Sequence, residues 1–398
     1  MTKLWDTTTN NNNKSSTTTA ATNQQPRPQS VAVIGAGAVG CYYGARLWQA
    51  GHDVQFYART TTTTTTPSLP TTTAKKVDLT IESIDGNFVL PDWPVVDDTR
   101  AMRPAPDWIL VTLKSTALSQ LPSLLRPLLQ QQAKEGGARR HTTNILTLMK
   151  GLVDDDLVTL LQQELYGDEE GDTSSFLDCC RTLYGGLAFL AAHRTSPTHV
   201  QHVFAGPIAA GVVTSHVSDA TARHELEQLW QPVPTVPCQW ESNVRVGRYR
   251  KLLWNLPFNS ISVLMGGLSM EEMTSDPSLL HLVKCAMEET LAIAVADCGT
   301  NDNDALSSDH VNRILAMAAT MGDFLPSTTI DFLEGRPMEV EYLFTKPLER
   351  AQALGVATPH LWSLVQMVQA LERQREQKQQ EQDCQPDDYK SDNSKKNQ

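Results

Sequence analysis

The chain has 398 residues, of which 40% are hydrophobic, and its formal net charge is −12. The length predicts two domains with non-globular additions, and the acidic balance argues against nucleic acid as the main partner. The sequence has neither a secretory h-region nor an apolar run of membrane-spanning length, so no membrane association is expected.

The seven cysteines show neither CxxC spacing nor a disulfide framework, so they are expected to be reduced thiols of an intracellular protein. No metal site is predicted. Residues 1–30 are rich in Thr, Asn, Ser and Gln and are expected to be disordered. A cytoplasmic location is expected. The alternative is an organellar transit peptide, which Asp6 and the lack of an Arg-rich amphipathic pattern disfavour.

A strand, a glycine-rich turn and a helix are predicted from residue 31 onward, where the chain reads VAVIGAGAVG. Residues 31–34 are apolar and rich in β-branched side chains, as is typical of a buried strand. Gly35, Gly37 and Gly40 follow with GxGxxG spacing. The first glycine permits a tight turn, the second lets a pyrophosphate approach the backbone, and the third lets the helix pack closely on its strand.

The elements around these glycines favour a dinucleotide-binding unit. The helix predicted over residues 39–49 would offer N–H groups and the positive end of its dipole to phosphates. A second strand is predicted over residues 54–58, which completes the order strand, turn, helix and strand. The expected cofactor contacts in the turn are Gly35, Ala36, Gly37, Ala38, Val39 and Gly40.

Arg59 closes the second predicted strand. Enzymes that select NAD usually have Asp or Glu near this point for the ribose hydroxyls, whereas an arginine suits a 2′-phosphate. The predicted cofactor is therefore NADP(H). The alternative is that Arg59 is a solvated surface residue. The Thr-rich residues 60–76 are predicted to be an inserted loop.

Further strands are predicted after this insert. Residues 77–81 and 88–90 should form a hairpin, and residues 108–113 and 144–149 should be buried parallel strands. These two strands end at Lys114 and Lys150, on the side of an α/β sheet where ligands bind. Two more strands are predicted at 184–192 and 199–211, with turns at Ser196–Pro197 and Gly206–Pro207.

The sequence changes to long helical patterns at about residue 242. The predicted fold class is therefore α/β, with an N-terminal Rossmann-type dinucleotide-binding domain over residues 31–240. An all-α domain is predicted over residues 241–373. Residues 374–398 are predicted to be a disordered polar tail, whose early part could instead extend the last helix.

One helix at the start of the second domain carries a polar stripe. Lys251, Asn255 and Asn259 recur at i, i+4 and i+8, so they share one face of the helix. Such groups need partners when they are buried, and a keto acid would offer a carboxylate and a carbonyl. The alternative is that the amides cap backbone near the helix start. Pro257 should kink this helix or free a carbonyl.

Two later residues allow a simple structural interpretation. Ser327 follows Pro326 at a predicted helix start and is most simply an N-cap. Glu339 is most simply a first-turn acid that the helix dipole favours.

Taken together, these features resemble the ketopantoate reductase family (2-dehydropantoate 2-reductases). The resemblance covers about residues 31–372 and depends on the GxGxxG turn, the K-x-x-x-N-x-x-x-N stripe and the Ser-x(11)-Glu pair. It implies a Rossmann domain, a helical C-terminal domain and NADPH in a cleft between them. It assigns catalytic roles to Lys251 and Glu339, substrate-orienting roles to Asn255, Asn259 and Ser327, and cofactor contacts to Arg59 and Lys114.

The resemblance implies NADPH-dependent reduction of a 2-keto acid to a 2-hydroxy acid, with 2-dehydropantoate as the first choice of substrate. Family members usually have Asn where this chain has Lys150, and prototype members have Asn where Phe324 stands. These departures concern the substrate side chain rather than the hydride chemistry. The alternatives are another 2-oxo acid as substrate, or a catalytically idle NADP(H)-binding regulator. A monomer or a homodimer is expected.

Overall fold

The computed structural model describes residues 27–59, 77–129, 142–163, 179–299 and 306–383. Most of the predicted N-terminal disordered segment, the Thr-rich insert and the end of the polar tail lie outside these residues. The chain divides into two compact units. Unit 1 comprises Met1–Lys251 with Asp302–Asp304, and unit 2 comprises Leu252–Asn301 with Ala305–Gln398.

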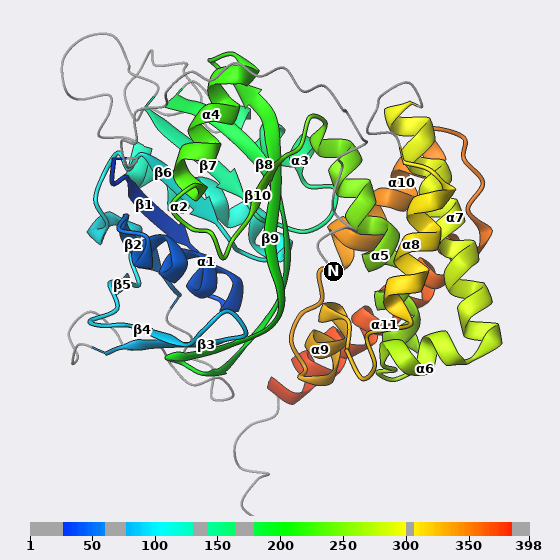
Figure 1. The fold of residues 1–398 in the computed structure, drawn as a ribbon. Helices are drawn as coiled ribbons and strands as arrows, with labels where there is room; N and C mark the ends of the chain where they lie inside the picture. The colour runs from blue at the N-terminus through cyan, green and yellow to red at the C-terminus, as the bar shows by residue number, and fades with distance from the viewer. Residues whose placement is uncertain (1–26, 60–76, 130–141, 164–178, 300–305, 384–398) are drawn as a thin grey trace, which may run out of the picture. The chain divides into compact units, whose positions relative to one another are not determined.

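Unit 1 is built on a 10-stranded sheet in the order β4-β3-β9-β8-β7-β6-β1-β2-β5, with β10 paired to β9 (Figure 1). The strands are β1 (Ser30–Ile34), β2 (Asp53–Tyr57), β3 (Leu79–Ser83), β4 (Phe88–Leu90), β5 (Val95–Val96), β6 (Trp108–Val111), β7 (Thr143–Thr147), β8 (Cys180–Ser196), β9 (His199–Ser215) and β10 (Cys238–Trp240).

The middle of the sheet is parallel, as the sequence predicted. Strands β6 and β7 are buried along their whole length, which explains why they read as continuous apolar runs. The predicted hairpin is also confirmed, since β3 and β4 pair antiparallel with Ile81 opposite Phe88.

The carboxyl ends of four neighbouring strands, β1, β2, β6 and β7, lie at one level of the sheet, in line with Gly185 inside β8. Ile34 is in register with Tyr57 and with Val111, Val111 with Thr147, and Thr147 with Gly185. The segments that follow β1, β2, β6 and β7 therefore emerge along the same edge, whereas β8 continues beyond Gly185 to Ser196. This edge is where ligands bind in sheets of this kind.

Strands β8 and β9 form a hairpin that is longer than predicted, with 17 residues in each strand. The turn predicted at Ser196–Pro197 is confirmed, but the turn predicted at Gly206–Pro207 is wrong. Those residues lie inside β9, where Ala205 and Gly206 have φ angles of 59° and 144° and the register with β8 shifts. The Gly-Pro pair therefore marks an irregularity within a strand rather than its end.

In the described part of unit 1, α-helices cover the sheet (Figure 1). They are α1 (Ala38–Gln49), α2 (Leu121–Leu129), α3 (Asp154–Gln163) and α4 (Asp219–Trp230). Helix α4 was not predicted from the sequence. Its start signal is Ser218, whose side chain accepts a hydrogen bond from the Thr221 N–H. Its apolar face is narrow, with Leu226 and Leu229 among its few buried residues, and this obscured the helical period.

The described part of unit 2 contains helices and turns and no strand, which confirms the prediction of an all-α C-terminal domain. Helix α5 (Val244–Leu264) passes from unit 1 into unit 2 after Lys251. It is continuous through Pro257. The remaining helices are α6 (Met270–Ser275), α7 (Pro277–Cys298), α8 (Ser308–Ala318), α9 (Ser327–Leu333), the π-helix η6 (Glu341–Thr345), α10 (Lys346–Ala353) and α11 (Pro359–Asp383).

Helix α11 extends through the first part of the Gln-rich tail to Asp383, as the alternative reading of that segment anticipated. Among the helices described, none combines the length and the apolar composition that are needed to cross a bilayer.

Candidate active site

The glycine-rich turn between β1 and α1 has the geometry that the sequence predicted. Gly35 has a φ of +111°, which favours glycine. A Cβ on Gly40 would lie 2.1 Å from the Gly35 carbonyl oxygen and 2.4 Å from Thr112 Oγ1, so only glycine lets α1 pack this closely. A Cβ on Gly37 would meet nothing within 4 Å, so the space beside this residue is open to a ligand.

The end of β2 holds this turn in place. The carbonyl oxygen of Tyr57 accepts hydrogen bonds from the N–H groups of Gly35 and Ala36, at 3.1 and 3.0 Å. The next N–H groups along the chain belong to the first turn of α1, where Ala38 and Val39 follow the N-cap residue Gly37. Because Gly37 has no side chain to cap the helix, this terminus suits an anion. The turn therefore fits the pyrophosphate of a dinucleotide.

Arg59 follows β2 at the same edge of the sheet. Its side chain is exposed and donates a hydrogen bond to Gln120 Oε1 at 3.4 Å. Burial raises the pKa of the nearby Tyr57, and the positive charge of Arg59 opposes this shift. Beside Tyr57 lies a cavity of about 410 Å³, to whose lining Arg126 of α2 contributes. Arg126 could not be predicted from the sequence, because only folding brings α2 to the end of β2.

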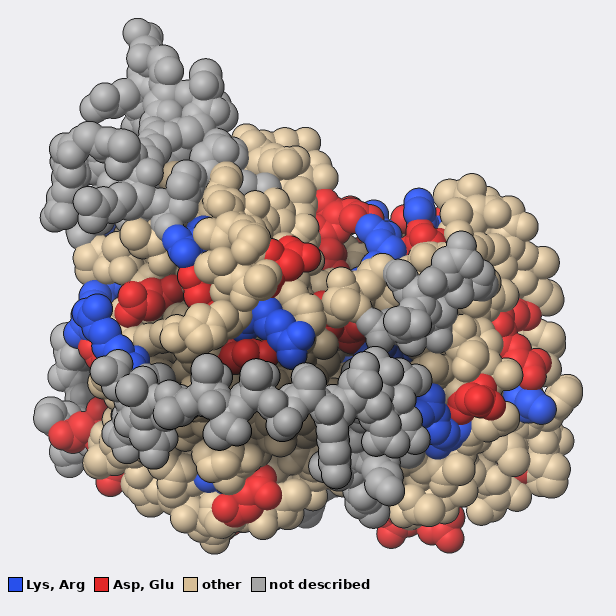
Figure 2. Space-filling view, turned by 45° about the horizontal axis from the view of Figure 1, so that its top comes forward, with Lys and Arg blue, Asp and Glu red and all other residues tan. Residues whose placement is uncertain are grey.

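Lysines follow two neighbouring strands at this edge. Lys114 is the N-cap residue of a short 3₁₀ helix after β6, and Lys150 follows β7. Beside them, the side chain of Lys251 reaches the carbonyl of Ala188 in β8. These local cations matter because the chain as a whole is acidic. On the face shown in Figure 2, acidic and basic side chains are interspersed, and no continuous basic area crosses the described surface.

The ammonium group of Lys251 contacts a strand carbonyl and an aromatic ring. Nζ donates a hydrogen bond of 2.6 Å to the Ala188 carbonyl oxygen and lies 5.5 Å from the centre of the Phe189 ring. Phe189 is buried in a small apolar cluster with Leu187 and Ala209. A partly buried lysine held in this way can serve as a positioned proton donor.

A second residue of α5, Arg248, joins this part of the sheet to the loop before α3. Its guanidinium donates to both carboxylate oxygens of Asp154, at 2.9 and 2.8 Å. It also donates to the carbonyl oxygens of Met149 and Gly186, at 2.6 and 3.0 Å. The role of Arg248 could not be predicted from the sequence, because its partner Asp154 lies 94 positions away.

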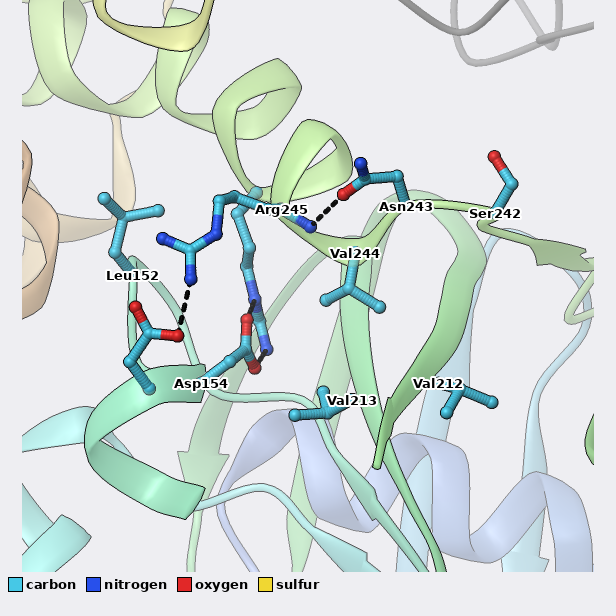
Figure 3. Close-up of a pocket in the computed structure, with 10 residues that line it drawn as sticks. Leu152, Asp154, Val212, Val213, Ser242, Asn243, Val244 and Arg245 are labelled. Atoms are coloured by element: carbon cyan, nitrogen blue, oxygen red, sulfur yellow. Dashed lines mark hydrogen bonds and ion pairs between the residues drawn. The ribbon is translucent and has the colours of Figure 1, made fainter. Parts of the chain in front are cut away.

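A cavity of about 270 Å³ lies beside this contact, where the start of α3, the start of α5 and the end of β9 come together. Figure 3 shows Asp154 and Arg245 on one side of it and Val212 and Val213 on the other. The half-buried Arg245 forms an ion pair with the exposed Asp155 at 2.5 Å.

Arg250 makes a separate buried ion pair on another face of α5. Its Nη1 lies 2.6 Å from Glu241 Oε2, and the two side chains are only 6% and 3% exposed. Glu241 follows β10, and a Cβ on Gly247 would lie 2.8 Å from its Oε2. This pair therefore ties the end of β10 to α5.

In unit 2, the structure brings Asn255, Asn259 and Ser327 into one neighbourhood. Asn259 Nδ2 donates to the Asn255 carbonyl oxygen at 2.6 Å, and its Oδ1 accepts the N–H of Thr328 at 2.9 Å. The protein itself thus supplies partners for the Asn259 amide, which was expected to meet a keto acid. The predicted N-cap role of Ser327 is wrong, because Pro326 is the N-cap and Ser327 is the first residue of α9.

Glu339 is 3% exposed and lies just before η6 in unit 2. Its carbonyl oxygen accepts the N–H of Leu343 at 3.4 Å, so the chain begins to turn at this residue. Glu341 is the acid in the first turn of η6, so the predicted first-turn position of Glu339 is wrong: this residue directly precedes the helix. Its catalytic role stays a prediction.

Comparisons with known proteins agree over both units. The family model described as "Ketopantoate reductase PanE/ApbA" matches residues 31–215, and the model described as "Ketopantoate reductase PanE/ApbA C terminal" matches residues 243–372. A 2-dehydropantoate 2-reductase of Nostoc sp. is 29% identical over 344 residues, which cover 86% of this chain and 94% of the relative.

Solved structures of the same kind are also similar. A crystal structure of 2-dehydropantoate 2-reductase from Geobacter metallireducens has a TM-score of 0.69 and 29% identity, and the match covers 86% of this chain and 99% of that one. A D-mandelate dehydrogenase in complex with NADH and anilino(oxo)acetate has a similar fold, with a TM-score of 0.66, 18% identity, and 87% and 99% coverage. The chain therefore belongs to the ketopantoate reductase family, a family of NADP-dependent oxidoreductases.

Proposed function

We propose that this protein reduces a 2-keto acid to a 2-hydroxy acid with NADPH, and that the substrate is 2-dehydropantoate, which gives pantoate. The observation that carries the proposal is the seating of Lys251. Its ammonium is held on the Ala188 carbonyl oxygen, in the same unit as a glycine turn that fits a dinucleotide. Asn255 follows one turn later on the same helix.

The chemistry divides between the cofactor and the side chains. NADPH, when bound, supplies two electrons and one hydrogen to the C2 carbon of the keto acid. Lys251 polarises the C2 carbonyl and gives a proton to its oxygen as negative charge develops there. The product is a neutral hydroxyl group, and the lysine must then regain a proton from solvent.

Other residues bind and orient the reactants in this proposal. The N–H groups of the first turn of α1 hold the pyrophosphate, and Arg59 pairs with the 2′-phosphate. Asn255 and Ser327 orient the substrate, and Asn259 supports them through its bond to Thr328. Glu339 hydrogen-bonds a substrate hydroxyl or positions Lys251.

The names of the Nostoc and Geobacter relatives support 2-dehydropantoate as the substrate. The second candidate is another 2-oxo acid with the same mechanism. Lys150 favours it, because this residue places an additional cation at the end of β7 where the family usually has Asn. Phe324 favours it as well, since an aromatic ring replaces an amide three residues before Ser327.

The test is NADPH oxidation with a panel of 2-keto acids that includes 2-dehydropantoate. Preference for 2-dehydropantoate supports the first candidate, and preference for another member of the panel supports the second. A protein that binds NADPH tightly but reduces no member of the panel would instead be a regulator. The presence of Lys251, Asn255 and Glu339 argues against that outcome, because cofactor binding alone requires none of them.

A further inference from the structure

We infer that Arg248 is a positioning residue for the reduction, because its side chain binds both the loop after β7 and strand β8, the strand that holds Lys251. The inference rests on the proposed function only for its kinetic consequence. The residues involved are Arg248 and Lys251 on α5, Met149 and Asp154 on either side of the loop after β7, and Gly186 in β8. All of them belong to unit 1.

The contacts of Arg248 explain how one side chain does this. Nη1 donates to the carbonyl oxygens of Met149 and Gly186, at 2.6 and 3.0 Å. Lys150 is the residue after Met149, and Ala188, which accepts the hydrogen bond of Lys251, lies two residues after Gly186. Arg248 and Lys251 are three residues apart, so they lie on the same side of the helix.

The rest of the guanidinium fixes the direction of these bonds. Nε and Nη2 form a bidentate pair with Asp154 at the start of α3, at 2.9 and 2.8 Å. A planar fork with donors on both edges can bind one carboxylate and two carbonyls at once. A lysine has a single nitrogen and cannot reproduce this geometry.

Two glycines of β8 make room for the arrangement. A Cβ on Gly185 would lie 3.0 Å from Asp154 Oδ1 and 2.5 Å from Val244 Cγ1. A Cβ on Gly186 would lie 2.6 Å from Leu148 Cδ2 and 3.1 Å from the Thr147 carbonyl oxygen. The strand is therefore shaped to let the loop approach closely at the point where Arg248 binds.

The burial of the pair argues for a geometric role rather than for stability. The side chains of Arg248 and Asp154 are 2% and 15% exposed. The desolvation penalty of such a pair can exceed its Coulombic gain, and apolar replacement of both partners is often neutral. What the ion pair supplies and an apolar pair cannot is the directed hold on two carbonyls.

The same helix offers a matched control. Arg250 and Glu241 form an ion pair that is also buried, but it ties α5 to the end of β10 instead of to the loop after β7. The test therefore compares Arg248→Met/Asp154→Leu with Arg250→Met/Glu241→Leu. Both double variants avoid the uncompensated buried charge that a single replacement would leave. Arg248→Lys tests whether charge without the fork is sufficient.

We expect kcat of Arg248→Met/Asp154→Leu to fall about 10–100-fold, the scale of a small misplacement of a catalytic group. The dissociation constant of NADPH should stay the same, because the glycine turn is untouched. The deuterium isotope effect with reduced cofactor labelled at the transferred hydrogen should rise, because the chemical step becomes slower. Arg248→Lys should not restore kcat, and the control should keep both kcat and the isotope effect.

Hydrogen exchange of the proteins without substrate supplies a readout that needs no activity. Amides of residues 148–153 and 186–190 should exchange faster in Arg248→Met/Asp154→Leu and should be unchanged in the control. Unchanged exchange in these two segments would overturn the inference, and so would a kcat that falls equally in both double variants. If the wild-type protein reduces no keto acid, the proposed function fails, while the exchange comparison still decides the positioning role.

Discussion

The side-chain nitrogen of Lys251 donates a hydrogen bond of 2.6 Å to the carbonyl oxygen of Ala188. The lysine is thus anchored to strand β8 in the protein alone, and its ammonium is oriented before any substrate arrives. A preoriented donor of this kind need not be ordered during the reaction.

Lys251→Ala should lower the rate of keto acid reduction about 10²–10⁴-fold, the usual contribution of a positioned acid or base. NADPH affinity should change little, because the glycine turn and Arg59 are intact. Steady-state kinetics and an NADPH titration measure the two effects. Lys284→Ala is the control, since Lys284 is an exposed lysine of α7 that pairs with Glu288. Wild-type turnover in Lys251→Ala would end the catalytic assignment.

Arg59→Asp should weaken NADPH binding by about 1.5–3 kcal/mol, the scale of a charge-assisted hydrogen bond. NADH binding should suffer far less, because NADH has no 2′-phosphate. Arg223→Ala removes an exposed arginine of α4 and should change neither affinity. Fluorescence titrations with both cofactors make the comparison. Equal losses for NADPH and NADH in Arg59→Asp would contradict a contact with the 2′-phosphate.

Two alanine substitutions in the glycine turn should separate stability from cofactor binding. Gly40→Ala places a methyl group 2.1 Å from the Gly35 carbonyl oxygen, and this overpacking should cost about 1–3 kcal/mol of unfolding free energy. Gly37→Ala meets no protein atom within 4 Å and should keep the wild-type Tm. It should nevertheless weaken NADPH binding, because the methyl group occupies the space offered to the pyrophosphate. Tight NADPH binding by Gly37→Ala would place the pyrophosphate elsewhere.

Asn259→Ala should destabilise unit 2 by about 1–3 kcal/mol, because the buried Thr328 N–H loses its acceptor. Asn255→Ala is the informative comparison, since Asn255 is proposed to orient the substrate and its replacement should mainly raise KM. Thermal unfolding and kinetics of both variants test whether Asn259 stabilises unit 2 and Asn255 binds the substrate. If Asn259→Ala kept its Tm but lost substrate affinity, Asn259 would contact the substrate directly.

Acidification should weaken unit 1 through His52. Its Nδ1 accepts the N–H of Gln29 at 3.1 Å and its Nε2 lies 3.1 Å from the Leu229 carbonyl oxygen, an arrangement that requires the neutral ring. Burial lowers the pKa of His52 in the folded state. The contribution of the neutral ring is therefore fully present above the unfolded pKa of about 6.5 and is lost as pH falls through the folded pKa.

Urea unfolding of the wild type and of His52→Gln, at about pH 7.5 and about pH 5.5 on either side of the unfolded pKa, tests this assignment. The difference in unfolding free energy between the two pH values should be smaller in the variant. The same pH dependence in both proteins would assign the acid sensitivity to other groups.

Local sequence signals predicted the elements that form the site on the sheet, but they did not predict the long-range contacts around it. The GxGxxG turn and the strands before Lys114 and Lys150 could be read from the sequence, because their signals lie within a few residues. The Arg248–Asp154 pair could not be read, since its members lie 94 positions apart and each alone resembles a solvated charge. The Gly206–Pro207 turn was predicted wrongly because a Gly-Pro pair fits a strand irregularity as well as a strand end.

The hydrogen bonds from Gly35 and Ala36 to the Tyr57 carbonyl oxygen bear on how the protein could distinguish NADPH from NADH. They join the glycine-rich turn to the last residue of β2, which lies two positions before Arg59. In the proposed binding mode, these two bonds therefore set the distance between the turn that would hold the pyrophosphate and the residue that would hold the 2′-phosphate. We expect a variant with a shortened sequence after Arg59 to keep the same distance between the glycine turn and Arg59.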